Sequence, residues 1–205
     1  MVIMSDPLLM WRGRFGDDYT ERNLFSAKVI KQREDSLAGV LGTLPIDLVI
    51  EPGCGSGANL KALQELGYRV IGIEPNRKAI SEAITSLRSP FVLLNSTCYQ
   101  INVSDGKADL VLSAGLLIHI PEDRLNEAIV EMLRVSKKYL LIIEYYSEVE
   151  EELNYRGNGG MLWKRNWPEI FEQYPVTLVK NGYFDKSQGY DDCHWYLYQK
   201  WVNLL

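Results

Sequence analysis

Short apolar runs alternate with amphipathic segments through the middle of the chain. Five apolar runs have the length of strands, and they cover residues 46–51, 68–74, 91–95, 109–115 and 138–144. Between them, apolar residues recur at helical spacing over residues 58–66, 76–88 and 121–135. Because strands that alternate with helices connect through right-handed crossovers, this pattern predicts an α/β fold with a doubly wound, mostly parallel sheet.

Other patterns occupy the two ends of the chain. Residues 1–23 mix glycines, aromatic residues, arginines and acids without a clear period, whereas residues 23–41 fit one or two amphipathic helices. We expect residues 1–41 to form an N-terminal helical cap over a ligand site. The alternative is that the aromatic residues of this segment pack on the edge of the core.

The rhythm also changes after residue 146. An acidic stretch, a glycine-rich loop, a helix and two strands follow, over residues 147–152, 157–160, 163–174, 176–179 and 194–200. The two strands lie close enough in sequence to pair antiparallel, and we expect this terminal part to lie on the side of the substrate.

Length and charge limit the class of protein. A chain of 205 residues fits a single domain, with a cap at 1–41, a core at 46–146 and a terminal part at 147–205. The net charge of −5 argues against broad contact with nucleic acid. The three cysteines and two histidines lack the spacing of a disulfide framework or of a metal site, so no metal is expected.

A cytoplasmic location without a membrane partner is expected. The chain start has neither the basic region nor the long apolar core of a signal peptide, and no apolar run reaches membrane-spanning length. An odd number of widely separated cysteines suits a reducing compartment. The oligomeric state stays open.

Three glycines at alternate positions, Gly53, Gly55 and Gly57, separate the first strand from the next helix. Glycine permits positive φ and removes side chains that would block a ligand, so the turn predicts a binding site. The alternative is a tight connection without a ligand. Ala58 and Asn59 stand where a phosphate-binding loop has lysine and serine or threonine, which argues against an NTPase.

Two acidic residues narrow the class of ligand. Glu74 ends the second strand about 20 residues after the first glycine, where a carboxylate accepts the hydroxyls of an adenosine ribose. Its alternative role is to interact with the dipole of the next helix. Glu51, just before the glycines, would repel pyrophosphate and suits an amino group. A ribose-bearing zwitterion such as S-adenosylmethionine meets these conditions.

Residues 51–57, Glu74 and residues 109–115 resemble the motifs of class I S-adenosylmethionine-dependent methyltransferases. The resemblance implies a Rossmann-like seven-stranded sheet of order 3-2-1-4-5-7-6, in which strand 7 is antiparallel. It also implies S-adenosylmethionine as the cofactor and S-adenosylhomocysteine as the product.

The two ends of the chain resemble methyltransferases associated with pseudaminic acid biosynthesis. The segments that carry this second resemblance are residues 11–23, 117–120, 144–146, 154–157, 162–165 and 191–195. The family name reflects genetic association, so the resemblance implies a nine-carbon sugar or surface polysaccharide pathway and leaves the acceptor open.

The motifs and the resemblance assign candidate roles to individual residues. The candidates for cofactor binding are Trp11, Tyr19, Arg22, Asn23, Glu51, Gly53, Gly55, Gly57, Glu74, Pro75, Asn95, Ser96, Thr97, Ser113, Ala114, Gly115 and Leu117. The candidates for substrate binding are Tyr145, Tyr146, Tyr155, Arg156, Lys164 and Arg165. For these, the alternative is a solvated face with ordinary aromatic packing. His119 and Tyr145 are the candidate catalytic residues, although His119 also fits a structural role.

The leading hypothesis is a methyltransferase that acts on a small, anionic molecule. The acceptor would be an acidic sugar, a nucleotide sugar or an amino-acid-like metabolite, because basic residues stand among tyrosines after the fifth strand. Two alternatives remain: a methyltransferase for protein or RNA, and a non-catalytic subunit that only binds the cofactor.

Overall fold

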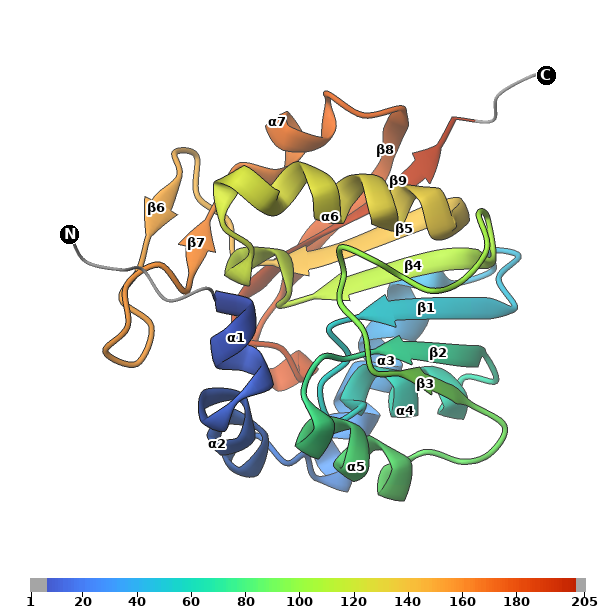
Figure 1. Cartoon of the computed structure of the whole chain (residues 1–205). Helices are drawn as coiled ribbons and strands as arrows, with labels where there is room; N and C mark the ends of the chain where they lie inside the picture. Colours follow the sequence, from blue (N-terminus) through green and yellow to red (C-terminus); the bar gives the residue numbers. More distant parts are fainter. Residues whose placement is uncertain (1–6, 202–205) are drawn as a thin grey trace.

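A seven-stranded sheet runs through the computed structural model, which describes residues 7–201 (Figure 1). Its strands are β1 (Leu48–Pro52), β2 (Arg69–Ile73), β3 (Val92–Leu94), β4 (Ala108–Ala114), β5 (Ser136–Glu144), β8 (Val176–Phe184) and β9 (Cys193–Lys200). They lie in the order β3-β2-β1-β4-β5-β9-β8. The pairs from β3 to β5 are parallel, and β9 is antiparallel to β5 and β8. The expected fold and strand order are confirmed.

Helices cover both faces of the sheet (Figure 1). One face carries α3 (Ala27–Leu41), α4 (Ala58–Glu65) and α5 (Arg77–Ser86), and the other carries α6 (Glu122–Val135) and α7 (Trp167–Phe171). Every residue of β1 is buried, as a central parallel strand requires, which explains its continuous apolar run.

Two short helices, α1 (Pro7–Arg12) and α2 (Arg14–Arg22), lie at the carboxyl ends of the parallel strands (Figure 1). Residues 7–22, whose sequence shows no clear period, are therefore mostly helical, in agreement with the expected helical cap. Trp11, Phe15 and Tyr19 follow one another at four-residue steps, and Trp11 contacts both other rings with centroids 5.1 and 5.2 Å apart. Helical spacing was present in these aromatic residues, but glycines and charges interrupt it. The expectations about the chain start concern residues 1–6, outside the described part.

The part after β5 begins with a small second sheet. β6 (Glu151–Glu152) and β7 (Trp163–Lys164) pair antiparallel (Figure 1). Between them, Tyr155 contacts Trp11 of α1, with ring centroids 6.5 Å apart. The expected helix over 163–174 is wrong at both ends, since α7 runs only from Trp167 to Phe171. Asn166 caps that helix by accepting from the Glu169 N–H at 3.4 Å, which explains the boundary. A 3-10 turn, η2 (Lys186–Gln188), connects β8 to β9.

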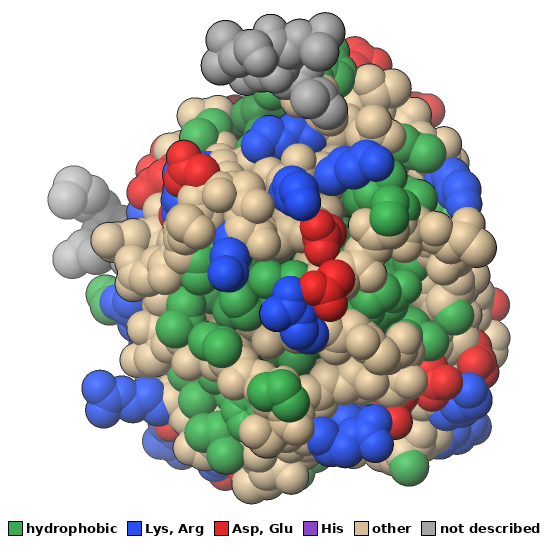
Figure 2. All heavy atoms as spheres, turned by 90° about the vertical axis from the view of Figure 1, so that its right-hand side faces the viewer, with side chains coloured by type: hydrophobic (Ala, Val, Ile, Leu, Met, Phe, Trp, Pro, Cys, Tyr) green, Lys and Arg blue, Asp and Glu red, His purple; other side chains and the backbone are tan. Residues whose placement is uncertain are grey.

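The surface carries both signs of charge. Figure 2 shows lysine and arginine side chains interspersed with acidic and apolar ones across the described part of one face. Within residues 7–201, no helix combines the length and the apolar character needed to cross a membrane.

Candidate functional site

A cavity of about 760 Å³ opens at the carboxyl ends of the parallel strands, beneath the cap formed by α1 and α2. Ligands of doubly wound sheets bind at this edge, and the volume is in the range of small-molecule sites. The candidates that line the cavity are Trp11, Tyr19, Arg22, Asn23, Glu51, Gly53, Gly55, Glu74, Pro75, Thr97, Ala114, Gly115, His119, Tyr145, Tyr155 and Arg156.

The glycine turn forms one wall of the cavity. Gly53 has φ +69°, which strains any other residue, and a Cβ there would lie 2.8 Å from Leu116 Cδ1, so the Leu116 side chain would have to shift. Gly55 has φ +53°, and a Cβ there would meet nothing within 4 Å. Bare backbone at Gly55 thus faces open space, which suits the close approach of a ligand.

Gly57 has a different role from the other two glycines. Its φ is +86°, and a Cβ would lie 3.2 Å from the Ala83 side chain. Gly57 precedes α4 and lies outside the lining of the cavity. Its small size lets the start of α4 pack on α5, which gives Gly57 a role in helix packing.

Glu51 lines the cavity and has one carboxyl oxygen without a partner. The side chain is only 2% exposed, and Asn59 Nδ2 donates to its Oε1 at 2.7 Å. Oε2 has no hydrogen-bond partner among the residues that the structure describes. Burial raises the pKa of this carboxyl to about 8, although Asn59 and the Arg33 charge lower it. A buried carboxylate with a spare acceptor suits a cationic group.

Arg33, Asn59 and Tyr190 extend this site beyond the predicted residues. Arg33 donates from Nη1 to Asn59 Oδ1 and from Nε to the Gly189 carbonyl, both at 2.9 Å. The Tyr190 hydroxyl donates to the same Asn59 oxygen at 3.1 Å. Since a guanidinium has five N–H donors, Arg33 keeps donors for an anion at the cavity wall. The sequence offered one signal for these three residues: Asn59 is a polar residue on the buried face of α4.

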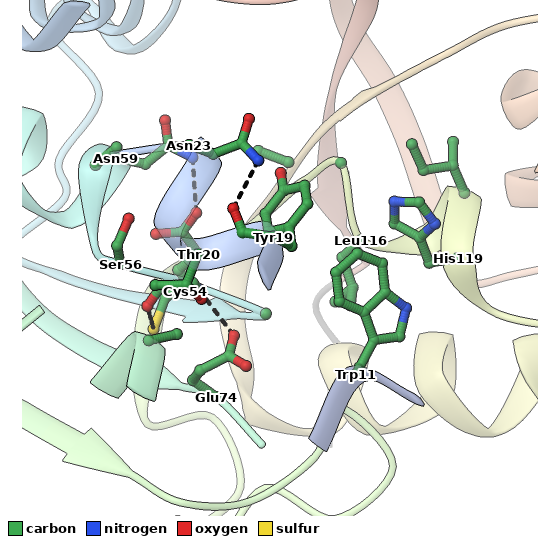
Figure 3. A pocket seen from close by; sticks show the side chains of 18 of the residues that line it. Trp11, Tyr19, Thr20, Asn23, Cys54, Ser56, Asn59, Glu74, Leu116 and His119 are labelled. Carbon is green, nitrogen blue, oxygen red and sulfur yellow. Dashed lines mark hydrogen bonds between the residues drawn. The ribbon is translucent and has the colours of Figure 1, made fainter. Parts of the chain in front are cut away.

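Glu74 lies below the glycine turn, with Cys54, Ser56 and Asn59 nearby on the same side of the cavity (Figure 3). Its Oε2 accepts from the Gly55 N–H and its Oε1 from the Asn76 N–H, both at 2.9 Å. Burial raises the pKa of Glu74 to about 7, and the two N–H donors lower it. The two bonds fix the carboxylate between the glycine turn and the start of α5.

Asn76 connects the cap to the core, a role that the sequence did not reveal. Its Nδ2 donates to the Trp11 carbonyl at 3.0 Å and to Asp17 Oδ1 at 2.9 Å. Its Oδ1 accepts from the Ala79 N–H at 2.8 Å and thereby caps α5. One side chain thus holds α1 and α2 above the residues that follow β2.

His119 lies across the cavity from Glu74, beside Trp11 and Leu116 (Figure 3). It ends the 3-10 turn η1 (Leu117–His119), and its Nδ1 lies 2.6 Å from the Met161 carbonyl. Because a carbonyl only accepts, Nδ1 carries the proton and Nε2 is left with its lone pair. Burial lowers the pKa of His119 to about 4, so the ring is neutral at neutral pH.

Aromatic and basic side chains surround His119 on the acceptor side. Its ring centroid lies 4.7 Å from Trp11 and 5.1 Å from Tyr155. Arg156, next in the chain, lines the cavity with a left-handed φ of +52°. Tyr145 also lines it, and burial raises the pKa of its hydroxyl well above the usual value. The cap and the part after β5 therefore meet over the site.

Seven further candidates lie outside the lining of the cavity, and three of them support its walls. Ser113 donates to Glu144 Oε1 at 2.9 Å, and the Leu117 N–H donates to the same oxygen at 2.9 Å. Arg165 is buried and donates to the Leu117 carbonyl. These three residues thus make contacts that support the walls of the cavity.

The other four lie at the edge of the site or away from it. Asn95 Nδ2 donates to the carbonyls of Glu74 and Pro75, and Ser96 Oγ donates to the Gln100 carbonyl. The Tyr146 ring packs against His194 at 5.1 Å, and Lys164 pairs with Glu151 across β7 and β6. Their roles in binding stay predictions.

A family model described as a methyltransferase domain matches residues 50–142, which run from β1 into β5. This stretch contains the glycine turn, Glu74 and η1. A search of curated proteins finds no match.

Solved structures of low sequence identity share the fold. A 1,6-didemethyltoxoflavin N1-methyltransferase of Burkholderia thailandensis aligns with a TM-score of 0.76 at 14% identity, covering 98% of this chain and 93% of that one. Magnesium protoporphyrin IX methyltransferase of Synechocystis PCC 6803 aligns with a TM-score of 0.71 at 16% identity, covering 98% and 100%. A SAM-dependent methyltransferase of Aquifex aeolicus gives 0.71 at 16%, covering 92% and 100%.

Proposed function

We propose that this chain, which carries a methyltransferase domain over residues 50–142, transfers a methyl group to a small anionic molecule in the cytoplasm. The cofactor is S-adenosylmethionine, which the family match and neighbours crystallised with it or with S-adenosylhomocysteine support. The acceptor is an acidic sugar, a nucleotide sugar or an amino-acid-like metabolite of a surface polysaccharide or specialised pathway.

The unpartnered oxygen of Glu51 is the observation that carries the proposal. A methionine moiety has an ammonium for Glu51 Oε2 and a carboxylate for the spare donors of Arg33, and Asn59 bridges the two side chains. A site that presents one acid and one guanidinium side by side suits a zwitterion better than a phosphate. The residues present therefore fit this cofactor.

Glu74 and the glycine turn complete that fit. Glu74 lies at the end of β2, where a carboxylate can accept ribose hydroxyls, and its negative charge rejects a ribose phosphate. Gly55 leaves the backbone bare beside it. These residues would hold the nucleoside part of the cofactor, with Pro75 and Thr97 in the lining on the same side.

When bound, the cofactor supplies a methyl group on an activated sulfonium. The protein's part is to align the acceptor and, for a hydroxyl or protonated amine, to remove a proton. His119 is suited to accept that proton, because its neutral ring presents Nε2 without a partner in the described part of the chain. Tyr145 and Tyr155 would line the acceptor's path.

Basic side chains at the cavity support an anionic acceptor. Arg22 and Arg156 line it, and neither forms an ion pair with any residue in the range 7–201. Arg156 also adopts a left-handed backbone conformation, which costs roughly 1–3 kcal/mol for a residue other than glycine and often marks a functional position.

Calorimetry with S-adenosylmethionine and with NAD tests the core of the proposal. We expect binding of the former and none of the latter, and preferential binding of NAD would contradict the proposal. A screen of acidic sugars, nucleotide sugars and amino acids for transfer of a labelled methyl group then tests the acceptor. Transfer only to protein or RNA would refute a small-molecule acceptor and leave the cofactor assignment intact.

A further inference from the structure

The acceptor-side segment 147–165 contacts η1 at two points. The Met161 carbonyl accepts from His119 Nδ1 at 2.6 Å, and Arg165 Nη1 donates to the Leu117 carbonyl at 3.1 Å. Leu117 is the first residue of η1 and His119 is the last. We infer that Arg165 is a positioning residue, which holds η1 in place so that His119 presents Nε2 to the acceptor. The inference rests on the proposed role of His119.

Arg165 has an unusual environment for a charged side chain. It is 1% exposed, and Nε donates to Glu150 Oε2 at 2.5 Å. The guanidinium carbon lies 5.2 Å from the Trp163 ring centroid and 5.9 Å from that of Trp167. Its Nη2 has no partner among the described residues. A guanidinium that is buried but incompletely bonded is a poor source of stability, so another reason for its presence is needed.

The structure of η1 provides that reason. The turn comprises three residues and makes only two backbone hydrogen bonds of its own, from His119 to Leu116 and from Ile120 to Leu117. Other groups must therefore hold it. Glu144 accepts from the N–H groups of residues 116–118, at 3.0, 2.9 and 3.4 Å. Arg165 provides the complementary bond, because it donates to a carbonyl of the same turn.

The two contacts of segment 147–165 have different consequences for His119. The Met161 carbonyl decides which ring nitrogen carries the proton, and Arg165 decides where the turn itself lies. Tyr155 of the same segment packs on the His119 ring at 5.1 Å. The segment that lines the acceptor's side of the cavity therefore also holds His119 in position. A displacement of about 1 Å in such a group can cost roughly 100-fold in rate, so a loosened turn should be visible kinetically.

Arg165→Met is the primary test, because methionine keeps an apolar stem between the two tryptophan rings but cannot donate to Leu117. In the unaltered protein, nitrogen NMR of labelled histidine should show His119 with its proton on Nδ1. In the variant we expect a mixture of tautomers and about tenfold faster amide hydrogen exchange over residues 117–119, since a charge-assisted hydrogen bond is lost. Arg69→Met, which removes an exposed Asp47 partner at the other end of the sheet, should change neither.

Two further variants keep the test decisive. Arg165→Lys retains a donor and should restore most of the Nδ1 tautomer. Glu150→Gln weakens the partner of Arg165 and should shift the tautomer of His119 in the same direction as Arg165→Met, but less. If Arg165→Met fails to fold, Glu150→Gln takes its place in the test. An unchanged His119 tautomer in the folded variants would overturn the inference.

Kinetics separate this inference from the proposed function. With an acceptor in hand, kcat should fall about tenfold or more in Arg165→Met while KM for S-adenosylmethionine stays the same. A fall in kcat accompanied by a similar rise in KM for S-adenosylmethionine would indicate general damage and refute a positioning role. The NMR measurement needs no acceptor, so a tautomer shift without any methyl transfer would refute the proposed function alone.

Discussion

At the scale of single residues, the chemistry of Glu51 can be tested most directly. Its carboxyl is buried, its pKa is raised to about 8, and one oxygen lacks a partner among residues 7–201. An ammonium that binds there favours the ionised carboxylate, so binding should release a proton near neutral pH. Calorimetry of S-adenosylmethionine binding at pH 7 in two buffers of different ionisation enthalpy measures that release.

Glu51→Gln is the matched variant, because glutamine keeps the shape and can still bond to Asn59. We expect affinity for the cofactor to fall about 10- to 100-fold and proton release to diminish, since a charge-assisted hydrogen bond is lost. Unchanged affinity together with unchanged proton release would show that Glu51 does not contact the ammonium.

His119 gives a second prediction at this scale. His119→Gln should lower turnover roughly 100- to 10,000-fold, the usual contribution of a general base, and leave affinity for the cofactor unchanged. Because burial lowers its pKa to about 4, His119 should not cause a fall in turnover of the unaltered protein between pH 8 and pH 6. Steady-state rates across that range test this, and full activity of the variant would remove His119 from the mechanism.

At the scale of elements, two glycines of the turn have different surroundings: Gly55 lines the cavity, whereas Gly57 packs against α5. Gly55 and Gly57 both have positive φ, but only Gly55 lines the cavity. Alanine at either position should destabilise the fold by about 1 kcal/mol or more through backbone strain. Gly55→Ala should also weaken cofactor binding, because its methyl group would occupy the open wall. Calorimetry and thermal unfolding of the pair distinguish the two effects, and equal affinities would contradict them.

The attachment of the cap to the core is the second element with a specific test. Asn76→Ala removes the bonds to Trp11 and Asp17 and the N-cap of α5. We expect a loss of about 1 kcal/mol in stability and faster dissociation of the cofactor, since α1 and α2 cover the cavity. Ser26→Ala, which removes only the N-cap of α3, is the control for stability. Stopped-flow dissociation rates that match in the two variants would argue against a covering role.

At the scale of the whole molecule, the cavity carboxyls make stability depend on pH. The pKa values of Glu51 and Glu74 rise from about 4.5 to about 8 and about 7 on folding. A raised carboxyl pKa contributes stability that is fully present below 4.5 and lost as pH increases through 7–8. The pKa of His119 is lowered on folding, so its effect has the opposite sign. The stability that it contributes is lost as pH falls from 6.5 to about 4.

Two carboxyls outweigh one histidine, so the cofactor-free protein should lose stability between about pH 5 and pH 8. Saturation with S-adenosylmethionine should reduce that loss, because its ammonium compensates the ionised Glu51. Thermal melts across this range, with and without cofactor, measure both effects. A melting temperature that rises steadily up to pH 8 without cofactor would contradict this account.

Local sequence was sufficient for the sheet, its strand order through the recognised motifs, and the glycine turn with its two acids. Apolar periodicity and the need for glycine at positive φ depend on near neighbours, which explains this success. Where local signals conflicted, the bounds of elements could not be predicted. The aromatic residues of α1 and α2 stand at helical steps that glycines and charges interrupt, and β7 begins where a helix was expected.

Only the tertiary structure decided which side chains line the cavity and which support its walls. Arg33 reaches Gly189 across 156 positions of sequence, so nothing in either neighbourhood announces the contact. By sequence, Arg165 is a basic residue expected to face the substrate or the solvent. In the fold it is buried and bonds to the Leu117 carbonyl. Gly57 reads as the third glycine of a ligand turn, yet Ala83 of α5 determines its size. The partner of a side chain depends on elements that meet only after folding, and a one-dimensional pattern does not contain that information.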